Sequence, residues 1–451
     1  MDKKSLLAFA DRERSAFESK LQQLVEIPSV SADPAHKNDI RRCADAAAQT
    51  IREFGGEARL INTPGNPIVH GKFRSGPGGT TVTLYNHMDV QPASRETEPW
   101  DTDPFTFTKR NGRYFGRGTT DDKGPGLSAL WGMKAAREAG VPVNLDVLWE
   151  LEEEIGSPSF EGAIKEHAGE LATDHVIVSD TIWVSRSRPA APAGLRGMQG
   201  FTLSLEVGQT DQHSGVTGGA ARNPIGELIK LVAEMYDAGT GRVKIKGFYD
   251  DITPPTKQEL NDFRNSGFTV KQFKKDHLFK SIRTDDAMEV MKRIWAMPTF
   301  EVHGLVGGYT GPGIKTIIPP RGEAKISCRL VPNQNPRKIV ALVKAFVKQR
   351  NPDVKVTIEN SMAPYLAPTT GPLADAVKAA MKFAFGREPV FVREGGSIGA
   401  VNSMEKILKC PVMFLGLSLP EHGYHAPNEN FDWQQASGGM VAFAKYFELV
   451  S

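Results

Sequence analysis

A histidine and an aspartate stand at the end of an apolar run, and they limit how this chain can fold. The segment Val82-Thr-Leu-Tyr-Asn-His87-Met-Asp89 alternates apolar side chains as a strand does. Side chains two positions apart in a strand point to the same side, so His87 and Asp89 leave the strand together. Such a pair packs poorly but holds a metal ion well, with the carboxylate orienting the imidazole. A structural His–Asp pair would explain this segment alone equally well.

Four further segments end in carboxylates or histidines. They are Gly116-Arg-Gly-Thr-Thr-Asp121-Asp122, Leu145–Leu151 followed by Glu152-Glu153-Glu154, Val176–Ser179 followed by Asp180, and Pro411–Leu417 followed by His422 and His425. Ligands of open α/β sheets bind beyond the carboxyl ends of the strands, so we expect these side chains to share one crevice. Two histidines and three carboxylates suit two metal ions if one carboxylate bridges them. Two such ions about 3.5–4 Å apart lower the pKa of a shared water.

The acidic residues also have simpler interpretations. Glu152-Glu153-Glu154 could be a solvated acidic turn, the usual fate of a charge run, and Asp180 alone would suit a loop or cap. Adjacent Glu153 and Glu154 point in different directions on an extended segment, so one can bind metal while the other stays free as a base. Because five segments ending in this way are improbable by chance, the pattern favours a metal centre.

Strand-like runs alternate with helical patterns at both ends of the chain. This order is typical of an α/β fold with a mostly parallel sheet covered by helices. We expect strands at 80–86, 145–152, 176–179 and 411–417, and helices at 4–26, 38–54 and 124–139. Asn111-Gly112 predicts a hairpin turn between two of these elements.

The middle of the chain has a different pattern. Strands at 200–207, 298–306, 322–331 and 353–359, with helices opening at Pro224 and Pro336, match the split βαβ order of a small α+β, ferredoxin-like domain. We therefore predict a catalytic domain in two parts, residues 1–194 and 362–451, interrupted by an inserted lid and dimerisation domain at 195–361. The polar residues 250–290 could shape the pocket that receives the substrate's side chain.

Charge and cysteine content exclude several classes of function. Lys and Arg number 55 against 53 Asp and Glu, so no basic field indicates nucleic acid or a membrane surface as partner. The charged start MDKKSLLAFADRERS does not resemble a secretory signal, and no apolar run approaches 18 residues. Three scattered cysteines, Cys43, Cys328 and Cys410, indicate reduced thiols and a cytoplasmic protein. Any metal must then be held by nitrogen and oxygen.

Several multi-residue motifs together resemble a known family. They are NHMDVQP, GRGTTDDKGP, EEEIGS, SDTIW, DQHSGVTGG, KTIIP, SCRLVPNQNP, REGGSI and HGYHAPNE. The chain resembles, over nearly its whole length, the two-zinc metallopeptidases that include carnosinase-type dipeptidases, glutamate carboxypeptidase, acetylornithine deacetylase and succinyl-diaminopimelate desuccinylase. It is most similar to the dipeptidase branch.

The resemblance implies a role for each member of the predicted centre. His87 and Asp180 would hold one metal, Glu154 and His425 the other, and Asp121 would bridge them. Asp89 would orient His87, and Glu153 would be the general base. Asp121-Asp122 would be joined by a cis peptide bond. His422 is an alternative to His425, which the following Ala-Pro-Asn-Glu favours, and Gly156-Ser157 sets the register of the three glutamates.

The resemblance also implies the substrate contacts. His213, which alone reads as a loop histidine, would steady the developing oxyanion from the neighbouring subunit of a homodimer. Arg329 would clamp the free carboxylate of the substrate, with Thr316 and Ser397 beside it. The cofactors would be two divalent ions, most simply Zn²⁺, with Mn²⁺ or Co²⁺ also suited to the site.

We therefore predict hydrolysis of the peptide bond of dipeptides or short peptides that carry a free C-terminal carboxylate. Deacylation of N-acyl amino acids by the same centre is the alternative. Gly395-Gly-Ser397-Ile-Gly399 fits the G-x-S-x-G motif of a serine hydrolase, but the chain after Ser397 is short for the acid and histidine that should follow. A non-enzymatic peptide-binding or metal-binding protein is disfavoured because Glu153 and His213 are both present.

Overall fold

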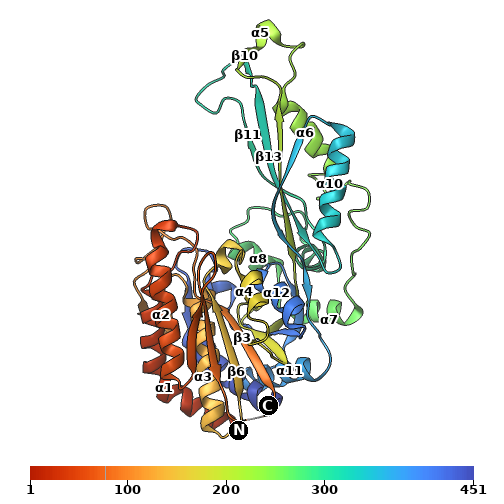
Figure 1. Cartoon of the computed structure of the whole chain (residues 1–451). Helices are drawn as coiled ribbons and strands as arrows, with labels where there is room; N and C mark the ends of the chain where they lie inside the picture. The colour runs from red at the N-terminus through yellow and green to blue at the C-terminus, as the bar shows by residue number, and fades with distance from the viewer. Residues whose placement is uncertain (77) are drawn as a thin grey trace.

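The computed structural model describes residues 1–76 and 78–451. Figure 1 shows an α/β part that contains both chain termini and a narrower part, made from the middle of the chain, that rises from it. Within the described residues, no helix is both long enough and apolar enough to cross a lipid bilayer.

A six-stranded sheet forms the centre of the α/β part. Its strands are β1 (Glu57–Ile61), β2 (Ile68–Phe73), β6 (Asn144–Glu150), β3 (Thr81–His87), β7 (His175–Val178) and β17 (Val412–Phe414), in this spatial order. Strands β6, β3, β7 and β17 are parallel, whereas β1 and β2 add an antiparallel edge. The predicted mostly parallel sheet is therefore confirmed, and its four parallel strands are the four that the sequence predicts.

Helices cover both faces of this sheet. The helices are α1 (Lys3–Val25), α2 (Lys37–Glu53), α3 (Gly124–Glu138), α4 (Phe160–Glu166), α11 (Pro372–Phe385), α12 (Gly399–Leu408) and α13 (Trp433–Val450). Leu84 belongs to the same hydrophobic core as residues of α1, α2, α3, α11 and α13. Its neighbour Tyr85 points to the opposite face and packs with residues of α4 and α12. The strand is buried on both sides, as expected for a parallel sheet.

The predicted hairpin lies beside this core. Its strands β4 (Thr108–Arg110) and β5 (Arg113–Phe115) are joined by Asn111 and Gly112, which have φ of 53° and 73°. Both values are in the left-handed region that a type I′ turn requires. A third strand, β18 (Asn430–Asp432), pairs with β5 and was not predicted.

The narrower part contains the predicted α+β module. Strands β9 (Gly197–Glu206), β11 (Glu301–Val306), β13 (Arg321–Leu330) and β14 (Lys355–Met362) form an antiparallel sheet in the order β11-β13-β9-β14. Helices α6 (Pro224–Met235) and α10 (Pro336–Arg350) pack on one face through a shared core. This order of strands and helices is the split βαβ arrangement. Short elements β10 (Gln212–His213), α5 (Ser214–Thr217) and β12 (Ile317–Ile318) lie at its far end (Figure 1).

The polar stretch at 250–290 is largely helical and returns to the α/β part. It forms α7 (Lys257–Asn265), α8 (Val270–Asp276) and the start of α9 (Ala287–Met291). Phe263 of α7 is fully buried in the same core as Phe391. The latter lies in β16 (Val390–Glu394), which with β8 (Ala190–Leu195) and β15 (Tyr365–Leu366) forms a three-stranded sheet. The segment therefore supports the α/β core, and the predicted domain boundaries stay a prediction.

Among residues 1–76 and 78–451, five short helical segments remain. They are Pro34–His36, Thr119–Lys123, Glu153–Ile155, Lys292–Ala296 and Pro420–His422.

Candidate metal centre

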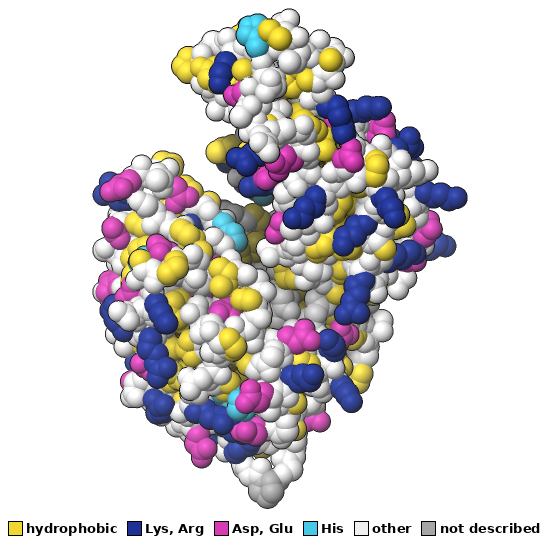
Figure 2. Space-filling model, turned by 45° about the horizontal axis from the view of Figure 1, so that its top comes forward, with side chains coloured by type: hydrophobic (Ala, Val, Ile, Leu, Met, Phe, Trp, Pro, Cys, Tyr) yellow, Lys and Arg dark blue, Asp and Glu magenta, His cyan; other side chains and the backbone are white. Residues whose placement is uncertain are grey.

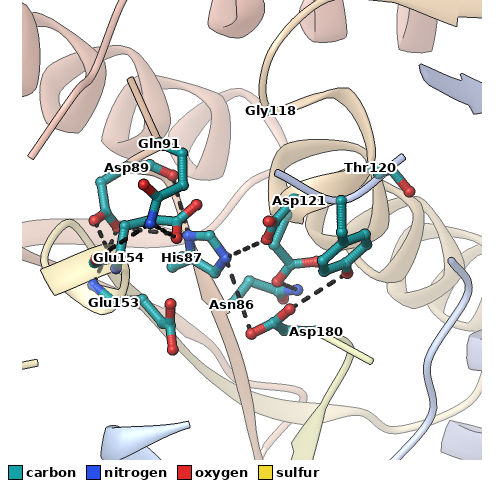
Figure 3. Close-up of polar contacts among 12 residues, drawn as sticks. Asn86, His87, Asp89, Gln91, Gly118, Thr120, Asp121, Glu153, Glu154 and Asp180 are labelled. Carbon is teal, nitrogen blue, oxygen red and sulfur yellow. Dashed lines mark hydrogen bonds and ion pairs between the residues drawn. The ribbon is translucent and has the colours of Figure 1, made fainter. Parts of the chain in front are cut away.

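The carboxyl ends of three parallel strands bring the predicted side chains together. His87 ends β3, Glu154 lies in the short helix that follows β6, and Asp180 follows β7. Asp121 lies in the turn before α3, and His425 lies in the loop after β17. Figure 3 shows His87, Asp121, Glu153, Glu154 and Asp180 around one space. The peptide bond between Asp121 and Asp122 is cis, as the resemblance implies.

Asp121 lies at the middle of the cluster. One of its carboxylate oxygens is 3.0 Å from His87 Nε2, and the other is 3.0 Å from His425 Nε2. His87 Nε2 is 3.9 Å from an oxygen of Asp180, and His425 Nε2 is 3.1 Å from an oxygen of Glu154. The five residues thus form two pairs joined by one carboxylate, the grouping that the family resemblance implies.

The ring of His87 is held by its other nitrogen. Nδ1 lies 3.0 Å from the backbone carbonyl of Asp89, which orients the ring so that Nε2 faces the Asp121 carboxylate. The Asp89 carboxylate is 3.5 Å from Nδ1 and accepts the backbone N–H groups of Glu153 and Glu154, at 3.2 and 3.1 Å. Asp89 therefore also fixes the turn that carries the two glutamates.

The acids of the cluster repel one another in a buried space. Burial raises the pKa of Asp180 to about 7, and the charges of Asp121 and Glu154 add to the rise. Burial also raises the pKa of Glu153, as do the charges of Asp180 and Glu154. Although burial alone would raise the pKa of Asp121, hydrogen bonds from His425 and His87 lower it. Such a concentration of negative charge is stabilised by divalent cations.

The donor set fits such cations. Ligand atoms of His87, Asp121 and Glu154 lie within 4.8 Å of one another, as do those of His87, Asp122 and Asp180. The buried Oε1 of Glu154 has no hydrogen-bond partner among the described residues. Imidazole nitrogen and carboxylate oxygen are ligands that zinc and manganese accept. Asp122, which has no role in the predicted set, accepts a hydrogen bond from Asn86 at 2.6 Å.

The structure separates the alternatives that the sequence left open, His422 or His425 and the register of the three glutamates. His422 is buried and bonds to Asp432 at 3.0 Å, away from the cluster. Glu152 accepts the backbone N–H groups of Asn66 and Ser159, at 2.7 and 3.0 Å, and so braces a neighbouring loop. His425, rather than His422, and Glu153 with Glu154, rather than Glu152, face the centre.

Two supporting residues, Glu429 and Gln91, were missed by the sequence analysis. Glu429 is fully buried and accepts the backbone N–H groups of Gly118, Thr120 and Asp121, each at 3.0 or 3.1 Å. Gln91 donates to the Glu154 carboxylate at 2.8 Å. Both belong to the motifs HAPNE and NHMDVQP, but nothing in their spacing distinguishes them from surface residues.

Arg329 and Ser397, two of the four predicted substrate contacts, lie together. The Arg329 guanidinium donates to the Ser397 hydroxyl at 3.0 Å, and this hydroxyl donates to the Arg196 carbonyl. Ser397 lies between β16 and α12, the context of a nucleophile elbow, but an arginine and a carbonyl, not a histidine, engage its hydroxyl. A cavity of about 1750 Å³ is lined by Arg196 and Arg329, and Figure 2 shows a deep hollow between the two parts of the molecule.

His213 and Thr316 are not at the centre in this chain. His213 belongs to β10 at the far end of the narrower part (Figure 1), and its side chain is exposed. The backbone carbonyl of Thr316 accepts the N–H of Ser214 at 3.0 Å in the same region. Both could reach a centre only across a subunit boundary or after a large domain movement.

Comparison with known proteins agrees with this centre. The model of peptidase family M20/M25/M40 matches residues 83–449. The chain belongs to this family. It is 34% identical to the Cys-Gly metallodipeptidase dug1 of Schizosaccharomyces pombe, covering 98% of this chain and 97% of the relative. It is 28% identical to the human Beta-Ala-His dipeptidase, covering 97% and 91%.

The solved structures agree as well. The dipeptidase Dug1p of Saccharomyces cerevisiae superposes with a TM-score of 0.87 at 28% identity, covering 99% of this chain and 98% of Dug1p. The M20 peptidase fold is thus shared over the whole described chain, including the inserted module. The resemblance that the motifs carry, with its dipeptidase branch, is confirmed.

Proposed function

We propose that this M20 peptidase is a metal-dependent hydrolase of dipeptides and short peptides with a free C-terminal carboxylate. One observation carries the proposal: His87, Asp121, Glu154, Asp180 and His425 converge while Glu153 stays beside them without a partner. The Glu153 side chain makes no hydrogen bond to another described residue, as Figure 3 illustrates. A carboxylate without a partner beside a metal centre is placed to serve as a base.

The residues divide the chemistry among them. His87, Asp121, Glu154, Asp180 and His425 would hold two divalent cations, which would supply polarisation of the scissile carbonyl and a lowered pKa for the attacking water. Glu153 takes a proton from the attacking water and delivers it to the leaving amine. Burial and the neighbouring acids raise the pKa of Glu153, which favours its accepting a proton. Zn²⁺ is the simplest choice for the site, with Mn²⁺ or Co²⁺ as alternatives.

Arg329 recognises the C-terminal carboxylate of the substrate. Burial lowers the pKa of its guanidinium, which nevertheless stays charged at neutral pH. Within the described residues it forms no ion pair with a carboxylate. A planar guanidinium in this state binds a substrate carboxylate through two parallel hydrogen bonds, and Ser397 beside it holds the clamp in place.

His213 completes the site from a second subunit. It is exposed at the far end of the inserted module, so a homodimer formed through this module would bring it to the partner's centre. Strand β11 is an edge of the module's sheet, and its Val302, Leu305 and Val306 side chains are 40%, 44% and 50% exposed. An exposed apolar edge strand is the kind of surface that pairs with another chain.

The experiment is a substrate panel under metal control. Purified protein is stripped of metal, reloaded with Zn²⁺, Mn²⁺ or Co²⁺, and assayed on dipeptides and on N-acyl amino acids. We expect dipeptide hydrolysis that a chelator abolishes and a serine-directed acylating reagent leaves intact. Faster cleavage of N-acyl amino acids than of any dipeptide would instead support the deacylase alternative.

The three buried, unpaired cysteines agree with our assignment of the protein to the cytoplasm.

A further inference from the structure

A buried carboxylate that the mechanism does not use lies beside the metal centre. Glu394 is the last residue of β16. Its neighbour Arg393 points to Glu259 of α7, at 2.8 Å. Because side chains alternate along a strand, Glu394 points away from α7, toward the side where Asp180 lies.

Within the described residues, no lysine, arginine or histidine side chain forms an ion pair with Glu394. Its Oε2 is buried and has no hydrogen-bond partner among the described residues. Burial raises its pKa to about 8, and the charges of Asp180 and Asp121 add to the rise, whereas the backbone N–H of Ile182 opposes it. A buried carboxylate oxygen with no partner is costly, so Oε2 calls for a ligand that donates a hydrogen bond, as an ammonium group does.

Glu394 is also close in the chain to the carboxylate clamp. Ser397, which contacts Arg329, is three positions further on. Three residues span at most about 11 Å, and an extended dipeptide spans about 7 Å. This short connection allows Glu394 and Arg329 to contact opposite ends of one short substrate.

We propose that Glu394 receives the free α-ammonium group of the substrate's N-terminal residue. The inference rests on the proposed function and deepens it, because it makes unblocked dipeptides the substrate class. An N-acyl amino acid offers no cation there, and its acyl group would exclude water from the carboxylate. A site built around a buried polar group rejects ligands that lack the matching group far more strongly than an apolar pocket rejects an extra methylene.

The test compares two substrates that differ only in the amine. Alanyl-leucine and propionyl-leucine share the scissile bond, the leaving leucine and the three-carbon acyl part. With the metal-loaded wild-type protein, we expect kcat/KM for alanyl-leucine to exceed that for propionyl-leucine by about 100-fold. In Glu394→Gln, alanyl-leucine should lose about 10- to 100-fold, the range for a buried charged hydrogen bond, while propionyl-leucine changes less than about threefold.

Two further variants serve as controls. Glu405→Gln removes an exposed carboxylate from the next helix, α12, and should leave both substrates unchanged. Glu394→Asp keeps the charge on a shorter side chain and should recover part of the preference for the amine. Metal content and Tm of each variant report on folding.

The outcomes separate this inference from the proposed function. Equal cleavage of the two substrates by the wild-type protein, or an equal loss on both in Glu394→Gln, would overturn the role of Glu394 while leaving a metal-dependent amidase. If the metal-loaded wild-type protein cleaves neither compound nor any member of the substrate panel, the proposed function itself fails.

Discussion

The carboxylate of Glu429 accepts the backbone N–H of Asp121 at 3.1 Å, although 308 positions separate the two residues in the chain. The same carboxylate pairs with the buried Arg117 at 2.9 Å. The turn that carries the central acid of the metal cluster is thus held by the segment that also carries His425. One buried side chain sets the spacing between two parts of the centre.

Replacement of Glu429 by alanine should therefore remove metal and stability together. The variant leaves the Arg117 charge and several backbone N–H groups buried without partners, and breaking a buried pair costs about 3–5 kcal/mol. We expect a clearly lower Tm and loss of metal on dialysis, measured by elemental analysis. Glu429→Gln keeps one acceptor oxygen, so its Tm and metal content should lie between those of the wild-type protein and Glu429→Ala. Full metal content in Glu429→Ala would contradict this role.

Glu153 and Glu154 should separate into base and ligand. Glu153→Ala should keep its metal but lose turnover by a factor of about 10²–10⁴, because proton transfer loses its carrier. Glu154→Ala should instead lose metal, since its carboxylate lies 3.1 Å from His425 in the cluster. Measured side by side, metal content and kcat distinguish the roles. Near-normal turnover in Glu153→Ala would refute the assignment of the base.

Arg329 should act on the substrate's carboxylate end. Arg329→Lys keeps a positive charge but loses the planar fork, so kcat/KM for dipeptides should fall by about 10- to 100-fold. Dipeptide amides, which lack the carboxylate, should be poor substrates of the wild-type protein and should be little affected by the substitution. A similar loss on both kinds of substrate would show that Arg329 supports the fold rather than the substrate.

The position of His213 predicts complementation between subunits. His213→Ala and Glu153→Ala should each be nearly inactive. When the two variants are mixed and allowed to exchange subunits, half of the dimers are mixed and one of the two sites in each is intact. About a quarter of the wild-type turnover should then return. No recovery, despite subunit exchange shown by labelled chains, would place His213 outside the partner's centre.

His175 should make stability depend on pH. It is buried against Tyr446, with ring centroids 5.9 Å apart, and burial lowers its pKa from 6.5 to about 4. The unfolded chain therefore binds a proton at a higher pH than the folded one, so stability is lost as pH falls from about 6.5 toward 4. The loss should reach about 2 kcal/mol at pH 5. In His175→Phe, denaturant unfolding should show a smaller change between pH 7 and pH 5.

The elements with strong local patterns could be predicted from the sequence. Val82–Leu84 alternation and the apolar run after Leu145 correspond to β3 and β6. His87, Glu154 and Asp180 could also be found, because each follows such a run and parallel strands bring their carboxyl ends together. Asp121 and His425 were assigned through the family resemblance. Asn111-Gly112 predicted its hairpin for a similar local reason.

Other features depend on partners distant in the chain. Strand β8 contains Pro192 and small residues, which do not suggest a strand, and it forms because β16 pairs with it some 200 positions later. Glu429 looks like any surface acid until the fold surrounds it with N–H groups. The polar segment at 250–290 gave no sign that Phe263 would return to the main core, because one buried aromatic among charged residues is a weak pattern.

The pairing of β17 with β7 has a consequence for how the enzyme is made. Strand β7, which leads to Asp180, pairs with β17, and β17 consists of residues 412–414. His425 and Glu429 come later still in the chain. Ribosomes deliver the N-terminal end first, so His87, Asp121, Glu154 and Asp180 emerge long before His425, and the inserted module is translated between them. Only a chain that extends through Glu429 can therefore hold all five members of the centre in place.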